Sequence, residues 1–395
     1  MYTKKSVFQL IAVLVVAAFV LSACGTAATP APTAVPPTQA PAATQAPTVA
    51  PTTAPTMSVM DTLAAACKKE GALNLIADPR DWANYGVLMD TFGSRYGVTI
   101  TDNNPLGTSA QELQAIQANQ GNTGPQAPDT VDVGYAFGPQ GASEGLFMPY
   151  KVAGWNDIAL KDPTGLWYEG YYGVIVLQVN TKVVKDVPQD WSDLLKPEYK
   201  GMVALGGIPT GSSEAMIGVW AAGLSKGGSL DNAAPGLDFF AQLNKAGNFV
   251  PVNGTASSFG QGQTPIILRW DYLALADKDT LAGNPPVQVV IPTSGTIGGP
   301  YVQAISAYAP HPNCAKLWME YLYSDEGQLE WLKGYVHPAR FQSLVDHNIV
   351  PADVLSKIPS AAAYKLAVIP TLDQETKAFD LISKGWETTV GVTVH

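Results

Sequence analysis

Hydrophobic residues recur along the chain with two different periods, and the changes of period predict the order of its elements. Apolar side chains spaced by three and four positions predict a helix over residues 82–96. A short apolar run closed by an Asp-Pro turn predicts a strand over residues 73–77. The same reasoning predicts helices over residues 60–69, 109–120, 191–195, 212–224, 237–246 and 314–323, and strands over residues 98–100, 131–135, 174–179, 202–205, 266–268, 287–291 and 301–307.

The alternation of strands and helices predicts an α/β fold, with a mostly parallel sheet covered by helices on both faces. The segment that carries the pattern, residues 58–395, is longer than the roughly 250 to 300 residues at which a single core tends to divide. We therefore expect two lobes. The order of the elements predicts a first lobe that begins with residues 58–170, a second lobe of residues 171–297, and a return to the first lobe with C-terminal helices over residues 298–395.

The N-terminus has a different pattern. Lys4 and Lys5 precede an uncharged apolar run over residues 7–20, which is shorter than the about 20 residues that a membrane-spanning helix needs. This is typical of a cleaved signal peptide, here residues 1–23. The segment Leu21-Ser22-Ala23-Cys24 resembles the lipobox of bacterial lipoproteins, which implies that Cys24 begins the mature chain and carries the lipid anchor. An ordinary signal peptide with an incidental cysteine is the alternative.

A tether is expected after the cysteine. Residues 25–60 contain no charged side chain and repeat proline, threonine and alanine, a composition that cannot build a core. Proline-rich linkers favour the extended polyproline conformation at about 3.1 Å per residue, so residues 24–57 could reach on the order of 100 Å. The alternative, a structured stalk, has no apolar periodicity to support it.

Charge and cysteine content narrow the function classes further. The formal net charge of −10 includes the two signal lysines, so the mature chain carries −12 (−10 minus 2). Binding to nucleic acid or to an anionic lipid surface is disfavoured.

Cys67 and Cys314 are the other two cysteines, both in predicted helices. A disulfide can persist outside the cytoplasm, but two free buried thiols fit the sequence equally well.

Several short motifs resemble, in the same order, those of bacterial extracellular solute-binding proteins. The clearest motif is a proline-containing turn followed by a helix and the end of that helix, over residues 309–328. The weaker motifs come earlier in the chain, and the resemblance as a whole spans about residues 63–338. The motifs are Ala65-Ala66-Cys67-Lys68-Lys69-Glu70-Gly71, Tyr172-Gly173-Val174, Val179-Asn180-Thr181, Pro188 with Trp191 and Asp193-Leu194-Leu195, Tyr199-Lys200-Gly201, Thr210-Gly211-Ser212-Ser213, Ala309-Pro310-His311-Pro312-Asn313-Cys314-Ala315-Lys316-Leu317-Trp318 and Tyr323-Ser324-Asp325-Glu326-Gly327-Gln328.

The resemblance implies a two-lobed type II periplasmic-binding-protein fold with a hinge and an interlobe cleft. A solute would be captured in the cleft by closure and released to the permease of an ABC importer in the membrane. The subgroup most resembled handles ferric iron, polyamines, thiamine and 2-aminoethylphosphonate, and nothing in the motifs selects among these. We expect a monomer with no cofactor and no metal. The expected hinge lies near residues 168–174 and 295–301, where Gly298-Gly299-Pro300 suits bending.

Three loops are candidates for holding the solute, because ligands of open α/β sheets lie outside the carboxyl ends of strands. They are residues 78–82, residues 107–109 and residues 210–213. The last two open helices with hydroxyl side chains, which could hold phosphate, phosphonate or carboxylate at helix N-termini. Plain helix capping by serine and threonine explains each of them equally well.

Aromatic and charged side chains add further candidates. Rings crowd residues 167–172, and Arg269-Trp270-Asp271-Tyr272 sets both charges beside two rings. Asp271 could receive an ammonium group and Arg269 an anion, or the two could pair with each other. We expect solute contacts from Asp78, Arg80, Trp82, Thr108, Ser109, Tyr135, Phe137, Tyr171, Thr210, Gly211, Ser212, Ser213, Trp270, Asp271 and Tyr301.

Three rival hypotheses have weaker support. Tyr171-Tyr172 suggests ferric iron, but adjacent residues of a strand point to opposite faces, and no histidine precedes His311. An extracytoplasmic lipid-anchored hydrolase is the alternative function. The chain lacks His-Glu-x-x-His, Gly-x-Ser-x-Gly, a Walker lysine loop and Cys-x-x-Cys, so we expect no catalytic site. A scaffold lipoprotein would lack a closing cleft.

Overall fold

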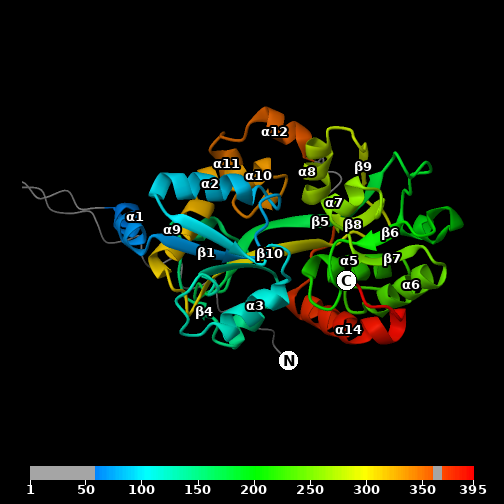
Figure 1. Ribbon diagram of the computed structural model, residues 1–395, viewed down its shortest axis with the longest axis horizontal. Helices are drawn as coiled ribbons and strands as arrows, with labels where there is room; N and C mark the ends of the chain where they lie inside the picture. Colours follow the sequence, from blue (N-terminus) through cyan, green and yellow to red (C-terminus); the bar gives the residue numbers. More distant parts are fainter. Residues whose placement is uncertain (1–57, 359–366) are drawn as a thin grey trace, which may run out of the picture. The chain divides into compact units, whose positions relative to one another are not determined.

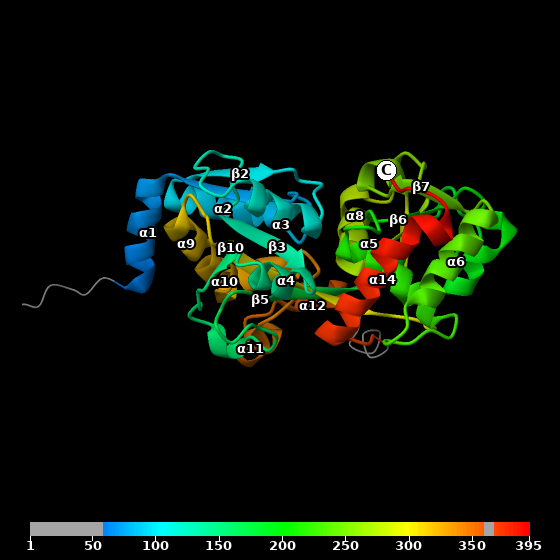
Figure 2. The ribbon, with the colours of Figure 1, turned by 90° about the horizontal axis from the view of Figure 1, so that it is seen from below.

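The computed structural model describes residues 58–358 and 367–395, which belong to one compact unit. The predicted signal peptide, Cys24 and the whole of the predicted tether, residues 24–57, lie outside the described residues. Figures 1 and 2 show strands and helices of the described part gathered in two lobes.

The first lobe contains a small parallel sheet, strands of the larger sheet, and the helices that cover them. The apolar residues of β1 and β3 are largely buried, as are Leu88 and Phe92 of the predicted amphipathic helix. The elements are α1 (Val59–Glu70), β1 (Ala72–Ile76), α2 (Tyr85–Tyr96), β2 (Thr99–Asn103), α3 (Ser109–Ala118), β3 (Thr130–Gly134), α4 (Phe137–Ser143), β4 (Phe147–Met148), β10 (Gly298–Ser306), α9 (Pro312–Leu322), α10 (Asp325–Lys333), β11 (His337–Pro338) and α11 (Phe341–Asp346).

The second lobe packs its helices on the other part of the larger sheet. In this lobe the C-terminal helix α14 (Leu372–Val390) lies against α5 (Ser213–Leu224) and α6 (Ala234–Lys245) (Figure 2). The other elements are the 3₁₀ turns Trp191–Leu195 and Pro197–Tyr199, β6 (Val203–Leu205), β7 (Phe249–Asn253), α7 (Ala256–Gly260), β8 (Ile266–Trp270), α8 (Asp271–Leu281) and β9 (Val287–Val290). A further helix, α12 (Ala352–Lys357), precedes the undescribed residues 359–366.

One long strand, β5 (Tyr168–Asn180), belongs to both lobes. Its first part pairs with β10 and β11 of the first lobe, and its second part pairs with β8 and β9 of the second. The strands of the larger sheet follow the order β3-β10-β5-β8-β6-β7. The strand β10 returns beside β5, with Gly298 opposite Val174, so two antiparallel strands connect the lobes.

The prediction of a mostly parallel sheet is wrong. Pairing is parallel between β1 and β2 and between β6 and both β7 and β8, but β10 is antiparallel to β3, β4 and β5, and β5 is antiparallel to β8 and β9. The chain crosses between the lobes on β5 and returns on β10, so these two strands run in opposite directions. Alternation of strands and helices along a sequence does not reveal such a return.

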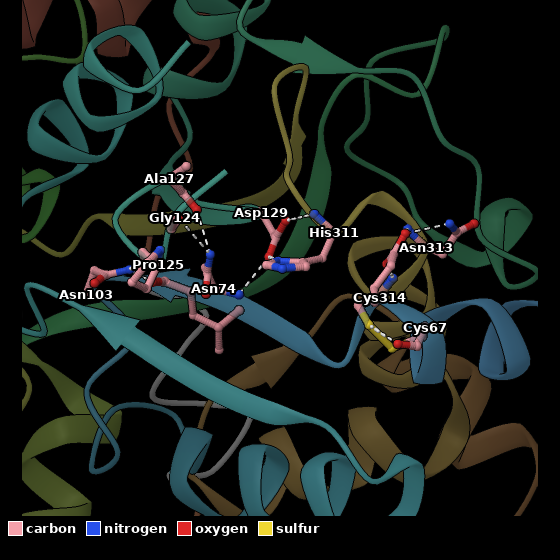
Figure 3. A network of polar contacts seen from close by, with 12 residues as sticks. Cys67, Asn74, Asn103, Gly124, Pro125, Ala127, Asp129, His311, Asn313 and Cys314 are labelled. Carbon is pink, nitrogen blue, oxygen red and sulfur yellow. Dashed lines mark hydrogen bonds and ion pairs between the residues drawn. A yellow bond between two sulfur atoms is a disulfide. The ribbon is translucent and has the colours of Figure 1, made fainter. Parts of the chain in front are cut away.

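The prolyl turn before α9 holds the first lobe together (Figure 3). Asp129, which precedes β3, accepts hydrogen bonds from the backbone N–H groups of Asn74 and His311, each at 2.7 Å. Its Oδ2 also lies 2.9 Å from His311 Nδ1. Burial raises the pKa of this carboxyl group. The motif around His311 therefore joins α9 to β1 and to the segment before β3.

A disulfide between Cys67 and Cys314 fastens α1 to α9 beside this network (Figure 3). Both residues are fully buried and their Cα atoms lie 4.4 Å apart. The Glu70 carboxylate also accepts hydrogen bonds from the first backbone N–H groups of α9, at 3.1 Å from Asn313 and 2.8 Å from Cys314. The sequence left the pairing of these cysteines open, and the tertiary contact between the two helices decides it.

Candidate functional site

A cavity of about 150 Å³ lies between the two lobes, comparable with a cavity that encloses a benzene-sized molecule. The first lobe lines it with the loops after β1 and β2, the start of α3, and β3. The second lobe lines it with the loop after β6, the start of α5, the segment between β7 and α7, β8 and α8. The lining includes Trp82, Thr108, Ser109, Glu112, Asp132, Tyr301, Gly207, Ser212, Ser213, Glu214, Asn253, Thr255, Arg269 and Asp277.

Two helices begin at this cavity from opposite lobes. Thr108 caps α3 by accepting a hydrogen bond from the Gln111 N–H, and Ser212 caps α5 by accepting from Ala215. Both predicted hydroxyl turns are thus helix caps and cavity walls at once. Ser109 Oγ accepts a hydrogen bond from the Gly134 N–H at 3.1 Å, which fixes the start of α3 against β3.

The lobes touch at the edge of the cavity through glycines. A Cβ atom on Gly134, at the end of β3, would collide with Ser213 Oγ from the second lobe. A Cβ atom on Gly211 would lie 3.2 Å from Thr108 Oγ1 of the first lobe. The contact at Gly134 needs the bare backbone of glycine, and at Gly211 a Cβ atom would fit only tightly, so the two lobes touch at both places.

Asp132 is the centre of a buried polar network on the wall of the first lobe. Its Oδ2 accepts hydrogen bonds from the hydroxyl groups of Tyr171 and Tyr85, the latter at 3.0 Å. The indole Nε1–H of Trp82 donates to Tyr171 at 2.6 Å. The other oxygen, Oδ1, has no hydrogen-bond partner among the described residues, although Asp132 is only 4% exposed.

Three further carboxyl groups surround Asp132. Glu112 Oε2 accepts a hydrogen bond from the Asp132 backbone N–H at 3.0 Å, and Asp78 and Asp102 lie behind, with the Asp78 N–H donating to Asp102 at 3.1 Å. Burial raises the pKa of Asp132 to about 7. Burial, reinforced by the neighbouring carboxylates, raises the pKa values of Asp78 and Glu112 well above their usual range.

The second lobe carries a paired cation. The Arg269 guanidinium lies 2.7 Å from Asp277 Oδ2 and 4.0 Å from Glu214 Oε1. Glu214 also accepts a hydrogen bond from the Trp270 N–H at 2.8 Å. Burial raises the pKa of Glu214 to about 7, although the charge of Arg269 opposes this. Asp277 therefore pairs directly with the arginine, and Glu214 is a second, more distant carboxyl group beside it.

The structure brings six of the predicted contact residues to the cavity and sets four others in the layer behind it. Trp82, Thr108, Ser109, Ser212, Ser213 and Tyr301 line it. Asp78, Tyr171, Trp270 and Asp271 are buried without being part of its lining. Asp271 accepts a hydrogen bond from the Val174 N–H at 3.0 Å, and the partner of Arg269 is Asp277 rather than Asp271.

The other five lie outside this cavity. Arg80 is exposed and forms an ion pair with Asp90 at 2.5 Å. Tyr135 packs against the Trp167 ring. Phe137 and Thr210 line a separate groove against α14, and Gly211 is the buried contact to Thr108. Their assignment as solute contacts stays a prediction.

Sequence reasoning missed the carboxylates of the cavity. Glu112 lies in a helical pattern, where a charged residue normally faces water. Asp132 gave a stronger signal, because it interrupts Val131 and Val133 in a strand whose five residues are all buried. A carboxyl group inside such a strand needs partners, and only the fold supplies the two tyrosines that provide them.

The iron hypothesis can be compared with the same geometry. Tyr171 faces Asp132, whereas the Tyr172 ring stacks on His337 with the ring centroids 4.9 Å apart. Within residues 58–358 and 367–395, no three His, Cys, Asp or Glu side chains are placed to share a metal ion.

Comparisons with known proteins agree with this architecture. Residues 129–366 match the model of a family described as "bacterial extracellular solute-binding protein". A protein of Sinorhizobium fredii, named "probable ABC transporter periplasmic-binding protein y4fP", is 28% identical over 159 residues, which cover 39% of this chain and 43% of that protein. The match thus spans less than half of that relative's length.

Two solved structures share the fold at low sequence identity. The periplasmic binding protein AfuA of Actinobacillus pleuropneumoniae, with fructose-6-phosphate bound, has a TM-score of 0.61 and 19% identity over 82% of this chain and 99% of that one. AgtB of A. tumefaciens R10, in complex with agropinic acid, has a TM-score of 0.64 and 14% identity over 82% and 99%. The predicted family resemblance and two-lobed type II fold are confirmed, and the hydrolase alternative has no support among these relatives.

Proposed function

We propose that this chain, which belongs to the family of bacterial extracellular solute-binding proteins, captures a small charged solute between its lobes and delivers it to the permease of an ABC importer. The family is extracellular, so the chain acts outside the cytoplasm. The observation that carries the proposal is the interlobe cavity, whose walls come from both lobes and include buried polar atoms that have no hydrogen-bond partner among the described residues.

Those atoms favour a binding role because burying a polar group without a partner is costly. Asp132 Oδ1 and Ser213 Oγ belong to residues that line the cavity, and neither atom has a hydrogen-bond partner among the described residues. Each such group costs about 1 to 3 kcal/mol. A solute in the cavity would supply the missing hydrogen bonds, and closure of the lobes would shield them from water.

The lipid anchor at Cys24 is part of the same proposal. Within the two described ranges, none of the helices combines the length and the apolar composition that crossing a membrane requires. We propose that acyl chains on Cys24 hold the protein at the membrane surface while the proline-rich segment gives it reach. Replacing Cys24→Ala in the full-length gene should move the protein from the membrane fraction to the soluble fraction, and continued membrane retention would contradict the anchor.

Thermal unfolding against a solute panel tests the transport role. The mature chain, with Cys24→Ser to avoid lipidation, is heated alone and with 2-aminoethylphosphonate, phosphate, putrescine, spermidine, thiamine, ferric citrate, fructose-6-phosphate and simple sugars. One saturable rise in Tm is expected, because a ligand present at a hundredfold excess over its Kd stabilises the folded state by about 2.7 kcal/mol. The absence of any shift across the panel would count against the proposal.

A further inference from the structure

The interlobe cavity has an unbalanced set of charges. Its lining contains the carboxyl groups of Asp81, Glu112, Asp132, Glu214 and Asp277 and the guanidinium of Arg269. The Nη1 group of that arginine donates to Asp277 at 2.7 Å and to Gln178 at 3.2 Å, while its Nε–H, 4.0 Å from Glu214, has no hydrogen-bond partner among the described residues. The remaining charge of the lining is acidic.

The imbalance is greatest on the wall of the first lobe. Glu112 and Asp132 line this wall, Asp78 and Asp102 lie near them outside the lining, and among the described residues no lysine, arginine or histidine forms an ion pair with any of the four. Asp132 is 4% exposed and lines the cavity, and its Oδ1 has no hydrogen-bond partner within residues 58–358 and 367–395. A buried carboxyl oxygen in this position is suited to accept a hydrogen bond from a cationic N–H group.

The two helix N-termini at the cavity do not make it a better site for an anion than for a cation. Their capping hydroxyl groups, those of Thr108 and Ser212, already accept hydrogen bonds from their own helices. Glu112 and Glu214 lie in the first turns of α3 and α5, where a carboxylate offsets the partial positive charge of the helix. An anionic solute at either helix would meet these carboxylates.

Aromatic faces complete the environment of a cation. Trp82 and Tyr301 both line the cavity, with ring centroids 5.5 Å apart, and Tyr171 stacks on Tyr301 at 5.6 Å. The faces of such rings attract ammonium groups, most strongly where water is excluded. Unlike an anion, an organic cation would find partners in both the carboxylates and the rings.

We infer that the solute of this cavity carries a protonated amine, whose nitrogen binds against Asp132 and Glu112 on the wall of the first lobe. The inference rests on the proposed binding function and specifies its substrate class as an organic ammonium compound rather than a phosphate or carboxylate. The hydroxyl group of Ser213 and the amide of Asn253 remain available for further polar groups of the solute.

Proton linkage follows from the same cluster. Burial raises the pKa of Asp132 to about 7 and that of Glu112 well above its usual range, so the empty site holds protons near neutral pH. An ammonium group favours the ionised carboxylates and displaces those protons, so its affinity should increase from pH 6 to pH 8. In the described part of the chain, the titratable groups that interact electrostatically with Asp132 are all acids: Asp78, Tyr85, Glu112, Tyr171, Tyr272, Tyr301 and Tyr323.

The experiment compares matched solutes on the mature chain by calorimetry at pH 6, 7 and 8, each up to 10 mM. Putrescine, spermidine and thiamine represent the ammonium class, and phosphate, succinate and fructose-6-phosphate represent the anions. At least one amine should bind, and its Kd should fall severalfold to tenfold per pH unit. Binding of an anion or a sugar without any amine would overturn the inference and leave the proposed function intact, whereas failure of every solute would count against both.

Charge-removing variants locate the amine. Asp132→Asn and Glu112→Gln keep an oxygen for the hydrogen bonds that each residue accepts, and each should weaken amine binding at least tenfold. Because these substitutions remove like-charge repulsion, the ligand-free Tm should hold or rise, which separates a lost contact from misfolding. Asp353→Asn, at an exposed carboxylate of α12, is the matched control. Unchanged amine affinity in both cavity variants would contradict this location of the ammonium group.

Discussion

At the scale of single residues, the buried carboxyl group of Glu375 is only partly satisfied by hydrogen bonds. Glu375 in the first turn of α14 is 1% exposed, and its Oε1 accepts a hydrogen bond from the Ala136 N–H at 3.1 Å. Its Oε2 has no hydrogen-bond partner in the described part of the chain. Because Ala136 belongs to the first lobe and α14 packs on the second, this bond joins the lobes.

A pH-dependent stability is expected from Glu375. Burial raises its folded-state pKa to about 8, above the unfolded value of about 4.3. The folded protein therefore binds the proton more tightly, so the stabilisation is complete below about pH 4.3 and is lost as the pH rises through about 8. In Glu375→Gln the amide stays neutral, and the variant should become more stable than the wild type as the pH increases.

The free energy of unfolding of Glu375→Gln should exceed that of the wild type by a small amount at pH 5 and by at most a few kcal/mol at pH 8. One pKa unit corresponds to about 1.4 kcal/mol. Urea unfolding of both proteins at several pH values measures this difference. The substitution Glu387→Gln, in the same helix but not among its buried residues, is the control. If the difference in free energy of unfolding between the wild type and Glu375→Gln stays constant from pH 5 to pH 8, Glu375 does not titrate in this range.

At the scale of elements, pairs of helices far apart in sequence are joined by specific links. The helices α1 and α9 are separated by more than two hundred residues, yet the disulfide, the Glu70 carboxylate and the Asp129 network bind this corner of the first lobe together (Figure 3). Capping boxes at Ser58 and Thr371 fix the starts of α1 and α14. Each box satisfies backbone N–H groups that the helix itself leaves free.

The disulfide should contribute markedly to the stability of the first lobe. It closes a loop with a sequence separation of 247 residues, and disulfides typically contribute about 2 to 4 kcal/mol. The double substitution Cys67→Ser with Cys314→Ser should lower Tm by several degrees. Dithiothreitol should lower the Tm of the wild type and leave that of the double variant unchanged. A wild-type Tm that does not respond to the reductant would contradict the expected contribution.

At the scale of the whole described unit, two antiparallel strands connect lobes that touch through glycine contacts. β5 and β10 pass between the lobes, and the pairing of Gly298 with Val174 lies within the segments expected to form a hinge. Closure about these strands is a hypothesis that the static structure motivates. It requires that the contacts between Gly134 and Ser213 and between Gly211 and Thr108 form when the lobes close.

Gly134→Ala should oppose closure, because its Cβ would collide with Ser213 only where the lobes meet. Small-angle X-ray scattering should show a smaller radius of gyration for the wild type with putrescine, or with whichever panel solute raises Tm, and little change for the variant. Solute affinity should fall at least tenfold while the ligand-free Tm changes little. Gly260→Ala, whose Cβ would make only an ordinary contact at 3.8 Å, is the control. An unchanged radius of gyration in the wild type would contradict hinge closure.

The amino-acid sequence alone indicated the family and the positions of many helices and strands, although it missed β7, α4, α7 and α8. Apolar periodicity placed α1, α2, α3 and α5 to within a few residues, because amphipathic spacing and end signals are local properties. The family motifs were also local. The sequence also identified the hydroxyl turns at Thr108 and Ser212, since helix-capping residues after strands mark the edge of a sheet where ligands bind.

Only the tertiary structure decided strand direction, the disulfide and the charge of the cavity. The helix α8 begins directly after β8, and no polar turn between them signals its start in the sequence. The pairing of β10 with β5 depends on contacts between residues more than a hundred positions apart. Asp132, Glu112 and Glu214 are isolated carboxylates in the sequence and become one acidic lining when two lobes meet. Pairing and electrostatics depend on distances in space, which local patterns of residues do not contain.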